Sequence, residues 1–359
     1  MSVKFFATIN CGGHVIGSTT LTSYQSLWTS PVARDDTEIL VKGPKIWSQD
    51  SLEKLANIAV IVTLSRGKCG LSKCISCYLV SMAASDLLVV ITGVILNTIV
   101  GIYFPGSFMS ITPICSSKIV LIYASMDISV WLTVAFTFDR FVAICCGKLK
   151  TRYCTKKVSA TVVGAVFTMG CLLNILWYFK FEPMHVINGT LWYCHTKASF
   201  YTSPVWVIYS AFHYIATPFL PFFLIVLLNV LTVRFIIVAS KARKALRRHN
   251  HNDPEMENRK RSIVLLFAIS GSFVLLWMIF IIHFLYYRIT NTLAYTGYDD
   301  PVFILEEAGY MLLLLSCCTN TGIYAATQQK FREELKNSLK YPFKQIITFL
   351  NKRQPCQYR

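Results

Sequence analysis

The chain has 359 residues, of which 54% are hydrophobic and 15% are charged, and its formal net charge is +17. A soluble globular protein carries about a quarter charged residues, so this composition excludes an ordinary soluble fold. The excess of basic residues is compatible with nucleic acid or with a membrane surface, and the distribution of charge along the chain decides between them.

The apolar residues are gathered into runs of membrane-spanning length. Six runs reach the roughly 20 residues that a helix needs to cross a bilayer. In chain order they are 75–103, 119–146, 158–179, 205–233, 262–287 and 308–329. A shorter run, 55–64, precedes them, and the residues before it are polar and interrupted by Pro and Gly. We therefore expect an all-α, seven-transmembrane helix bundle whose first helix is truncated at its outer end.

The loops between these runs alternate in charge. Lys and Arg concentrate in the loops after the first, third and fifth helices and in the segment after the seventh, whereas the other loops hold few bases and several acids. This alternation follows the positive-inside rule, which places the basic loops in the cytoplasm and the amino terminus outside. The charge therefore predicts contact with membrane lipid and no nucleic-acid partner. We expect a multi-pass protein of the plasma membrane.

Both ends of the chain differ from the bundle. Residues 1–50 lack the sustained apolar core of a signal peptide. After helix seven, Phe331, Leu335 and Leu339 share one face and charges the other, which predicts a helix on the cytoplasmic membrane surface. The expected parts are an extracellular segment, disordered or atypical, at 1–50, the transmembrane domain at 51–327, the amphipathic helix at 328–342 and a cytoplasmic tail at 343–359.

Two cysteines are expected on the extracellular side. Cys115 precedes helix three, and Cys194 lies in the loop between helices four and five. In an oxidising compartment they can pair and tie this loop across the top of helix three. The triplet Asn188-Gly189-Thr190 in the same loop is an N-glycosylation acceptor on the correct side.

Charged side chains inside the apolar runs require an explanation. Asp139 and Arg140 are adjacent at the cytoplasmic end of helix three, so we expect them near water. There the arginine side chain could extend to the membrane interface, which alone would avoid the free-energy cost of burying its charge. Asp86 is the lone charge within helix two, and Ser129, Ser316 and Asn320 stand at similar depth. Such an acid is either a site for a monovalent cation or proton, or a structural carboxyl group bonded to its neighbours.

Several motifs in order resemble the rhodopsin-like (class A) family of G-protein-coupled receptors, over roughly residues 55 to 342. The segment "TFDRFVAI" resembles the Asp-Arg-Tyr signature of helix three, with Phe141 in place of tyrosine, and "NTGIY" resembles the Asn-Pro-x-x-Tyr signature of helix seven. The spacing of Cys115 from Arg140 matches the family's disulfide. Further matches are Asn57, the sodium-site aspartate Asp86, the helix-five proline Pro221, and the helix-six switch residues Phe273 and Trp277.

Within that family, four segments are most similar to the orphan receptors 139 and 142 and their fish relatives. They are "LSRGKCGLSKC", "FDRFVAICC", "DPEMENR" and "TNTGIYAATQQKFREELK". The chain also departs from the family pattern. Asn229 stands where many members have a tyrosine, Ile279 where a helix-six proline is usual, and Arg259 where some members have an acidic partner for the helix-three arginine.

The resemblance implies a receptor, not an enzyme, that transduces an extracellular signal to a heterotrimeric G protein. It assigns coupling and activation to Asp139, Arg140, Phe141, Pro221, Phe273, Trp277, Asn320 and Tyr324. It implies an allosteric sodium ion at Asp86, Ser129, Ser316 and Asn320, and no other metal or cofactor. The expected ligand pocket contains Tyr123, Met126, His213, Trp277, Phe280, Phe284, Glu306 and Tyr310, and its aromatic character suits a small aromatic compound or a peptide.

Two other functions fit part of the pattern. An ion-coupled transporter or channel would use Asp86 on an ion path, but the sequence shows no internal repeat of the kind that such proteins often have. A product of a truncated or decaying receptor gene would not signal, and the short helix one with residues 1–50 would then be an artefact of the gene model. An in-frame exon in the genomic sequence upstream of Ser51 that encodes an apolar segment would show that residues 1–50 are such an artefact.

Overall fold

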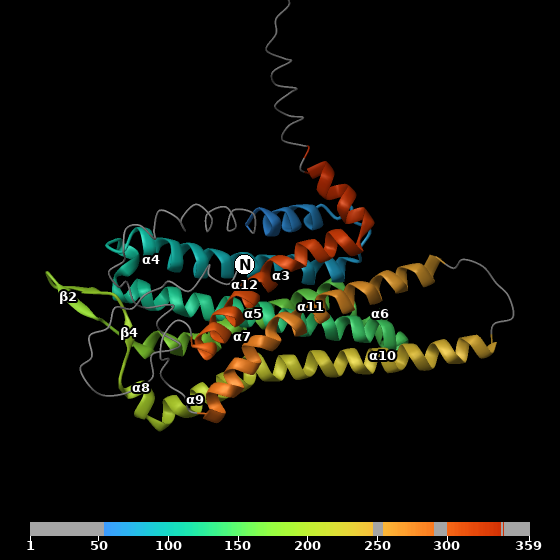
Figure 1. The fold of residues 1–359 in the computed structure, drawn as a ribbon. Helices are drawn as coiled ribbons and strands as arrows, with labels where there is room; N and C mark the ends of the chain where they lie inside the picture. Colours follow the sequence, from blue (N-terminus) through green and yellow to red (C-terminus); the bar gives the residue numbers. More distant parts are fainter. Residues whose placement is uncertain (1–53, 247–253, 291–299, 339, 341–359) are drawn as a thin grey trace, which may run out of the picture.

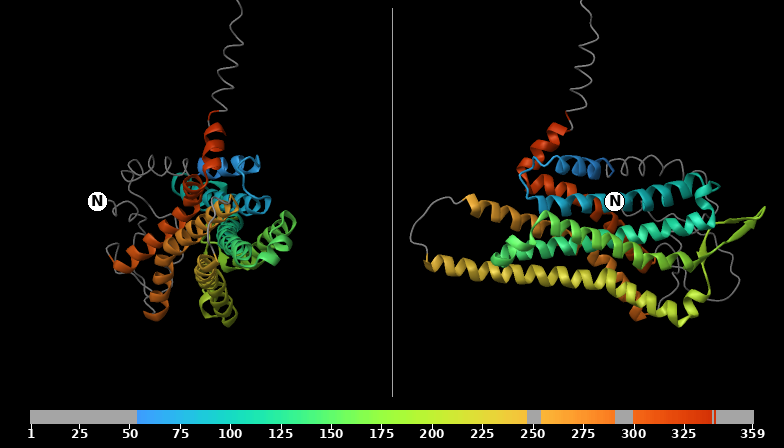
Figure 2. Two further views of the ribbon diagram at one scale, coloured as in Figure 1. Left: turned by 90° about the vertical axis from the view of Figure 1, so that its right-hand side faces the viewer. Right: turned by 180° about the vertical axis from the view of Figure 1, so that it is seen from behind.

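The computed structural model describes residues 54–246, 254–290, 300–338 and 340, and it is a bundle of long helices (Figure 1). Five helical spans are long and apolar enough to cross a membrane. They are Lys73–Ile99, Thr112–Cys145, Lys156–Lys180, Pro204–Lys241 and Lys260–Tyr286. Figure 2 looks along the bundle in its left panel and shows the helices side by side around a common axis. The chain is therefore a helical membrane protein, as its composition predicts.

Two further helices lie before and after these spans in the chain. The first described helix, Lys54–Ser65, is apolar and 12 residues long. Helix α12, Pro301–Thr327, begins at Asp300, whose carboxylate accepts a hydrogen bond from the Val302 N–H and caps the helix. The predicted amphipathic helix follows at 329–338 after a break at Gln328. Its Phe331 is fully buried against Tyr324, with 5.9 Å between ring centroids, whereas Leu339 lies outside the described residues.

The spans Lys73–Ile99 and Pro204–Lys241 change their hydrogen-bond pattern partway along their length. Helix α3, Lys73–Val89, continues as the π-helix η2, Val90–Ile99, and then as α4, Val100–Tyr103. Helix α9, Pro204–Tyr214, continues as the π-helix η5, Ile215–Phe219, before α10, Leu220–Leu246. Pro218 lies inside η5, where its missing N–H interrupts the α-helical ladder. The sequence pattern singled out Pro221 instead, which lies in the first turn of α10.

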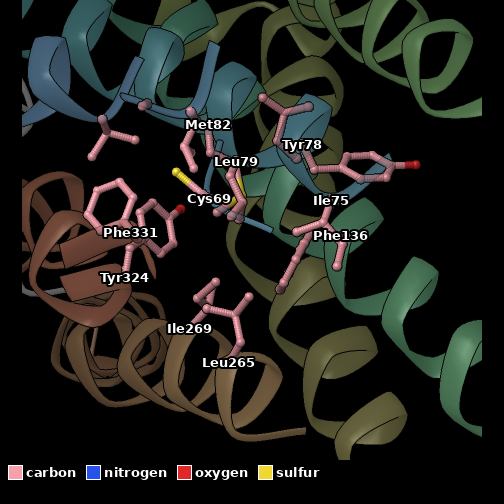
Figure 3. Packing of buried hydrophobic residues seen from close by; sticks show 14 of the residues in the cluster. Cys69, Ile75, Tyr78, Leu79, Met82, Phe136, Leu265, Ile269, Tyr324 and Phe331 are labelled. Carbon is pink, nitrogen blue, oxygen red and sulfur yellow. The ribbon is translucent and has the colours of Figure 1, made fainter. Parts of the chain in front are cut away.

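Helix α5, Thr112–Cys145, runs through the centre of the bundle and is largely buried. The apolar cluster at its carboxyl-terminal half joins it to α3, to α12 and to α11, Pro254–Thr290 (Figure 3). Tyr78, Phe136 and Tyr324 are almost completely buried in this cluster. Because residues from four helices share one core, a displacement of α11 must repack this region.

The loop after helix α7, Lys156–Asn174, forms the opposite end of the molecule. It consists of the 3₁₀ helix η4, Ile175–Lys180, strands β1–β4 and the short helix α8, Ser199–Thr202. Strands β1, Phe181–Glu182, and β4, His195–Thr196, pair antiparallel, as do β2, His185–Ile187, and β3, Thr190–Trp192. The Cys115–Cys194 disulfide is present and ties this loop to α5, as predicted. Asn188 lies at the hairpin turn and has a positive φ, which suits asparagine.

Candidate functional site

A buried carboxylate lies at the centre of the bundle. Asp86 on α3 is 1% exposed, and it accepts a hydrogen bond from the Ser129 hydroxyl of α5 at 2.5 Å and one from the Asn320 amide of α12 at 2.8 Å. Three of the four residues predicted for a sodium site are therefore in contact. Because each oxygen of the carboxylate has a partner, burial of Asp86 does not leave it unsatisfied.

The fourth predicted residue, Ser316, lines a cavity next to this carboxylate. Ser129 and Asn320 line the same cavity, and Phe273 and Trp277 of α11 form its outer wall. Its polar lining consists of hydroxyl and amide groups from α5, α11 and α12. The partners of the Asp86 carboxylate and the aromatic pair of α11 therefore line the same cavity. A shift of Trp277 would change the surroundings of Ser129 and Asn320.

A chain of aromatic rings leads outward from the cavity. Phe273 stacks on Trp277 with 5.1 Å between centroids, and Trp277 meets Phe280 edge-on at 5.9 Å. Phe280 in turn meets Tyr310 of α12 at 5.7 Å. A Cβ at Gly309 would lie 3.2 Å from the Phe280 Cα, so the small residue allows α11 and α12 to approach closely. Movement of one ring in this chain must displace its neighbours.

The remaining residues of the predicted ligand pocket fall into separate groups. Met126 packs against the Trp277 cluster. Phe284 is buried two turns after Trp277 along α11, where it packs against Tyr214 at 4.7 Å between centroids. Glu306 is buried, with 2% exposure. Tyr123 faces Trp177 at 5.5 Å, near His213. The structure therefore joins Met126, Trp277, Phe280 and Tyr310 through a series of packing contacts and places Tyr123 and His213 in a second environment.

That second environment contains a polar cluster that the sequence reasoning missed. The Asp127 carboxylate accepts a hydrogen bond from the Asn174 amide at 2.7 Å and lies 3.1 Å from His213 Nε2, which is also 3.1 Å from Asn174 Oδ1. The three residues come from α5, α7 and α9, and all are buried. Asp127 was visible in the sequence as an acid inside an apolar run, but its partners are 47 and 86 residues away and no local pattern indicates them.

Removal of this carboxylate is expected to loosen the contact of α5 with α7 and α9. Asp127→Ala leaves buried polar atoms of Asn174 and His213 with fewer partners, at a cost of about 1–3 kcal/mol. The melting temperature of the purified protein in detergent should fall by several degrees, and Asp127→Asn should lower it less. Ser117→Ala is the control, because this exposed hydroxyl on α5 bonds only to the Pro113 carbonyl oxygen of its own helix. Equal melting temperatures for Asp127→Ala and wild type would contradict a structural role.

The carboxyl-terminal end of α5 carries the second candidate site. Asp139 has no exposed surface and Arg140 is 4% exposed, so the pair is covered by protein and does not face water as expected. Arg140 donates to Asp139 Oδ2 from Nε at 3.0 Å and also from Nη2. The other oxygen, Oδ1, accepts a hydrogen bond from the Cys74 thiol of α3 at 3.1 Å. Phe141 beside them is half-buried.

Arg140 also reaches the neighbouring helix. Its Nη1 donates to the Ser262 hydroxyl of α11 at 3.2 Å, which links α5 to α11 through a neutral partner. Arg259 stands at the position where an acidic partner for Arg140 would be expected, and its side chain lies outside the described residues. About two turns further along α11, the Ser270 hydroxyl donates to Asn229 Oδ1 of α10 at 3.0 Å. Sequence reasoning identified neither serine, because serines are common and nothing local marks these two.

Two further motif residues lie between the two sites. Asn57, in the short first helix, donates to the Cys317 carbonyl oxygen of α12 at 3.2 Å. Tyr324 is 1% exposed and contributes to the core under the Asp139–Arg140 pair. Among the residues that the sequence associated with coupling, Phe273, Trp277 and Asn320 line the cavity and Tyr324 belongs to the apolar core, whereas Pro221 lies on α10.

Comparison with known proteins agrees with this arrangement. The family model described as 7 transmembrane receptor (rhodopsin family) matches residues 56–324. The chain is 23% identical over 305 residues to the thyrotropin-releasing hormone receptor of Gallus gallus, which covers 77% of this chain and 73% of that receptor. It is 30% identical over 129 residues to the receptor of the same name from Homo sapiens, covering 36% of this chain and 31% of that receptor.

Proposed function

Since the chain belongs to the rhodopsin family of seven-transmembrane receptors, we propose that it carries an extracellular signal to heterotrimeric G proteins through Arg140. The observation that supports this output site is the buried pair at the cytoplasmic end of α5, in which Arg140 is held by Asp139 and contacts Ser262 of α11. A buried arginine bound through hydrogen bonds to a second helix can be exposed when that helix moves. The transporter and the non-signalling product are not favoured by the family match.

The architecture proposed for this receptor has seven spans. Lys54–Ser65 would form the cytoplasmic half of the first span, and α12 would form the seventh span. The contact of Asn57 with α12 supports this arrangement, because it joins the first helix to the last. The distribution of basic residues then places the amino terminus outside, at the plasma membrane. The placement of this chain near the orphan receptors 139 and 142 stays a prediction from sequence segments.

Activation would be a shift between two packings of the bundle. In the packing seen here, Trp277 closes the cavity above Asp86, and Ser262 and Ser270 on the same helix bind Arg140 and Asn229. An agonist that moves Trp277 would displace α11, break the Arg140–Ser262 and Ser270–Asn229 hydrogen bonds and expose Arg140. A G-protein segment would then take the place of Ser262 at the guanidinium group.

A sodium ion fits the residues around Asp86 in chemical type. The carboxylate of Asp86 and the hydroxyl groups of Ser129 and Ser316 are oxygen donors, which hard cations prefer. A bound ion would supply positive charge between α3, α5 and α12 and would favour the packing in which these helices are close. Without it, the Ser129 and Asn320 hydrogen bonds satisfy the carboxylate.

The ligand is proposed to be a peptide or a small aromatic compound. Two of the relatives are named as receptors for a peptide hormone, thyrotropin-releasing hormone. The rings of Trp277, Phe280 and Tyr310 form a continuous aromatic surface that suits aromatic side chains. Glu306 is buried nearby on α12 and provides an acid for a ligand that carries a cation.

The proposal that the chain activates G proteins is tested by measuring nucleotide exchange on purified heterotrimers. The full chain is reconstituted in lipid nanodiscs, and binding of a non-hydrolysable GTP analogue is measured with each class of heterotrimer, with and without amino acids and peptides, including thyrotropin-releasing hormone. We expect exchange above that of empty nanodiscs with at least one heterotrimer and a further increase with one ligand of the panel. Exchange at the level of empty nanodiscs in every combination would contradict the proposal.

A further inference from the structure

The buried cluster of Asp127, Asn174 and His213 brings three atoms that can bind a metal close together. Nε2 of His213 lies 3.1 Å from Asp127 Oδ2 and 3.1 Å from Asn174 Oδ1. The Asn174 amide is fixed in this orientation, because its nitrogen donates to Asp127 Oδ2 and to the Gly170 carbonyl oxygen. One nitrogen and two oxygen atoms, carried by three different helices, therefore surround one point of the bundle.

The distances between these atoms suit a zinc ion placed among them. Zinc in proteins binds imidazole nitrogen at about 2.0–2.1 Å and oxygen at about 2.0–2.2 Å, usually in tetrahedral geometry. Two ligand atoms on such an ion are about 3.4 Å apart. Since Nε2 is now 3.1 Å from each oxygen, each separation has to grow by only about 0.3 Å. The cluster can therefore take up an ion with little repacking.

The imidazole can change from a hydrogen-bond donor to a metal ligand without a change of charge. In the packing seen here Nε2 carries the hydrogen, because the carboxylate and the amide oxygen beside it only accept. When a metal binds, the hydrogen moves to Nδ1 and the lone pair of Nε2 points to the ion. The Asp127 carboxylate supplies the negative charge that a buried cation needs.

We propose that Asp127, Asn174 and His213 form a zinc site that ties α5, α7 and α9 together. The family resemblance implies no metal other than sodium at Asp86. The new site differs from that one because it contains an imidazole, which favours zinc over hard cations such as sodium and magnesium. The inference goes beyond the proposed function and does not rest on it, since metal binding is measured on the protein without a G protein.

The surroundings of the cluster set the strength of binding. Among the described residues, no third His, Cys, Asp or Glu joins Asp127 and His213, so a water has to complete the coordination. The ring of Trp177 meets His213 edge-on at 5.1 Å, and its indole N–H, which has no partner in the described part of the chain, is available to such a water. Lys180 lies over this ring at 5.0 Å, and its positive charge opposes a second cation. We therefore expect weaker binding than at a closed structural zinc site, with half-saturation at micromolar zinc.

The first test is the melting temperature of the purified full chain in detergent, after treatment with a chelator and titration with zinc chloride. A metal that binds the folded state stabilises it by mass action, so wild type should gain a few degrees at saturating zinc. Magnesium chloride should give no rise, because imidazole is a poor magnesium ligand. His213→Gln should lose the rise, and Asp127→Asn should need at least tenfold more zinc. No rise in wild type, or an equal rise in His213→Gln, would overturn the site.

A second histidine–carboxylate pair provides the matched control. His195 Nε2 lies 3.2 Å from Glu182 Oε1 in the loop between α7 and α9, and both side chains are partly exposed. This pair has the same chemistry as His213 and Asp127 but is open to water, where it competes poorly with the hydration of the ion. His195→Gln should therefore keep the full zinc-dependent rise. Loss of the rise in His195→Gln would place the zinc in the loop and overturn the proposal.

The second test identifies the type of ligand and uses the unmodified chain. Cobalt(II) can replace zinc at sites with nitrogen and oxygen ligands, where it absorbs in the visible range, and a bound thiolate adds an intense band in the near ultraviolet. Wild type with cobalt chloride should show the visible bands without the thiolate band, and zinc should abolish them. These bands should be absent from Asp127→Asn and unchanged in His195→Gln. A thiolate band would place the metal at a cysteine, and either this result or equal bands in Asp127→Asn would overturn the inference.

Discussion

Replacement of Trp277 by alanine is expected to abolish agonist-driven nucleotide exchange at a surface density equal to that of wild type. Trp277 is 5% exposed, stacks on Phe273 and meets Phe280, and forms part of the wall of the cavity beside Ser129 and Asn320. Without its ring, a ligand that displaces the outer aromatic residues no longer moves the cavity wall. The agonist dose–response curve, measured as exchange per receptor at the surface, should be flat.

Loss of stability is the competing explanation for this result. Truncation of a buried tryptophan to alanine costs about 3–5 kcal/mol, so the variant also folds less well. Trp277→Leu fills more of the space and should fold better, yet it lacks the ring and should also fail to signal. Phe223→Ala is the control, since this aromatic residue of α10 is 61% exposed. An unchanged dose–response curve in Trp277→Leu would remove the ring from the mechanism.

The sequence was sufficient for those parts of the fold that depend on local composition. Membrane-spanning runs and the amphipathic segment with Phe331 follow from patterns over a few turns of helix. The Cys115–Cys194 disulfide was also predictable, because the side of the membrane limits which cysteines can pair. The π-helix around Pro218 was not predicted, since both Pro218 and Pro221 are compatible with a disturbed helix and only packing distinguishes them.

The partners of charged residues were the part that the sequence did not indicate. Asp139 meets Cys74, 65 residues away, and Arg140 meets Ser262, 122 residues away. Cysteine and serine carry no sign of such a role in their local sequence. The expectation that the Asp139–Arg140 pair lies near water was wrong for the same reason, because these two partners from α3 and α11 help to cover it and satisfy its hydrogen bonds.

Asp139→Asn is expected to raise basal nucleotide exchange several-fold. The carboxylate holds Arg140 through two charge-assisted hydrogen bonds, and a hydrogen bond of this kind contributes about 1.5–3 kcal/mol. Asparagine preserves the shape and one acceptor oxygen but loses the charge. Since about 1.4 kcal/mol changes an equilibrium tenfold, partial loss of this restraint suffices to populate the packing in which Arg140 is exposed.

The measurement is ligand-free exchange per receptor, with Glu182→Gln as the matched control. That variant also exchanges a carboxylate for an amide, but Glu182 is half-buried in the loop between α7 and α9, where it faces His195 at 3.2 Å. Its basal exchange should equal that of wild type. Flat basal activity in Asp139→Asn at equal surface density would mean that Cys74 and Ser262 position the guanidinium group without the carboxylate. In that case Ser262→Ala should raise basal exchange where Asp139→Asn does not, because the contact with α11 would then be the restraint that activation has to break.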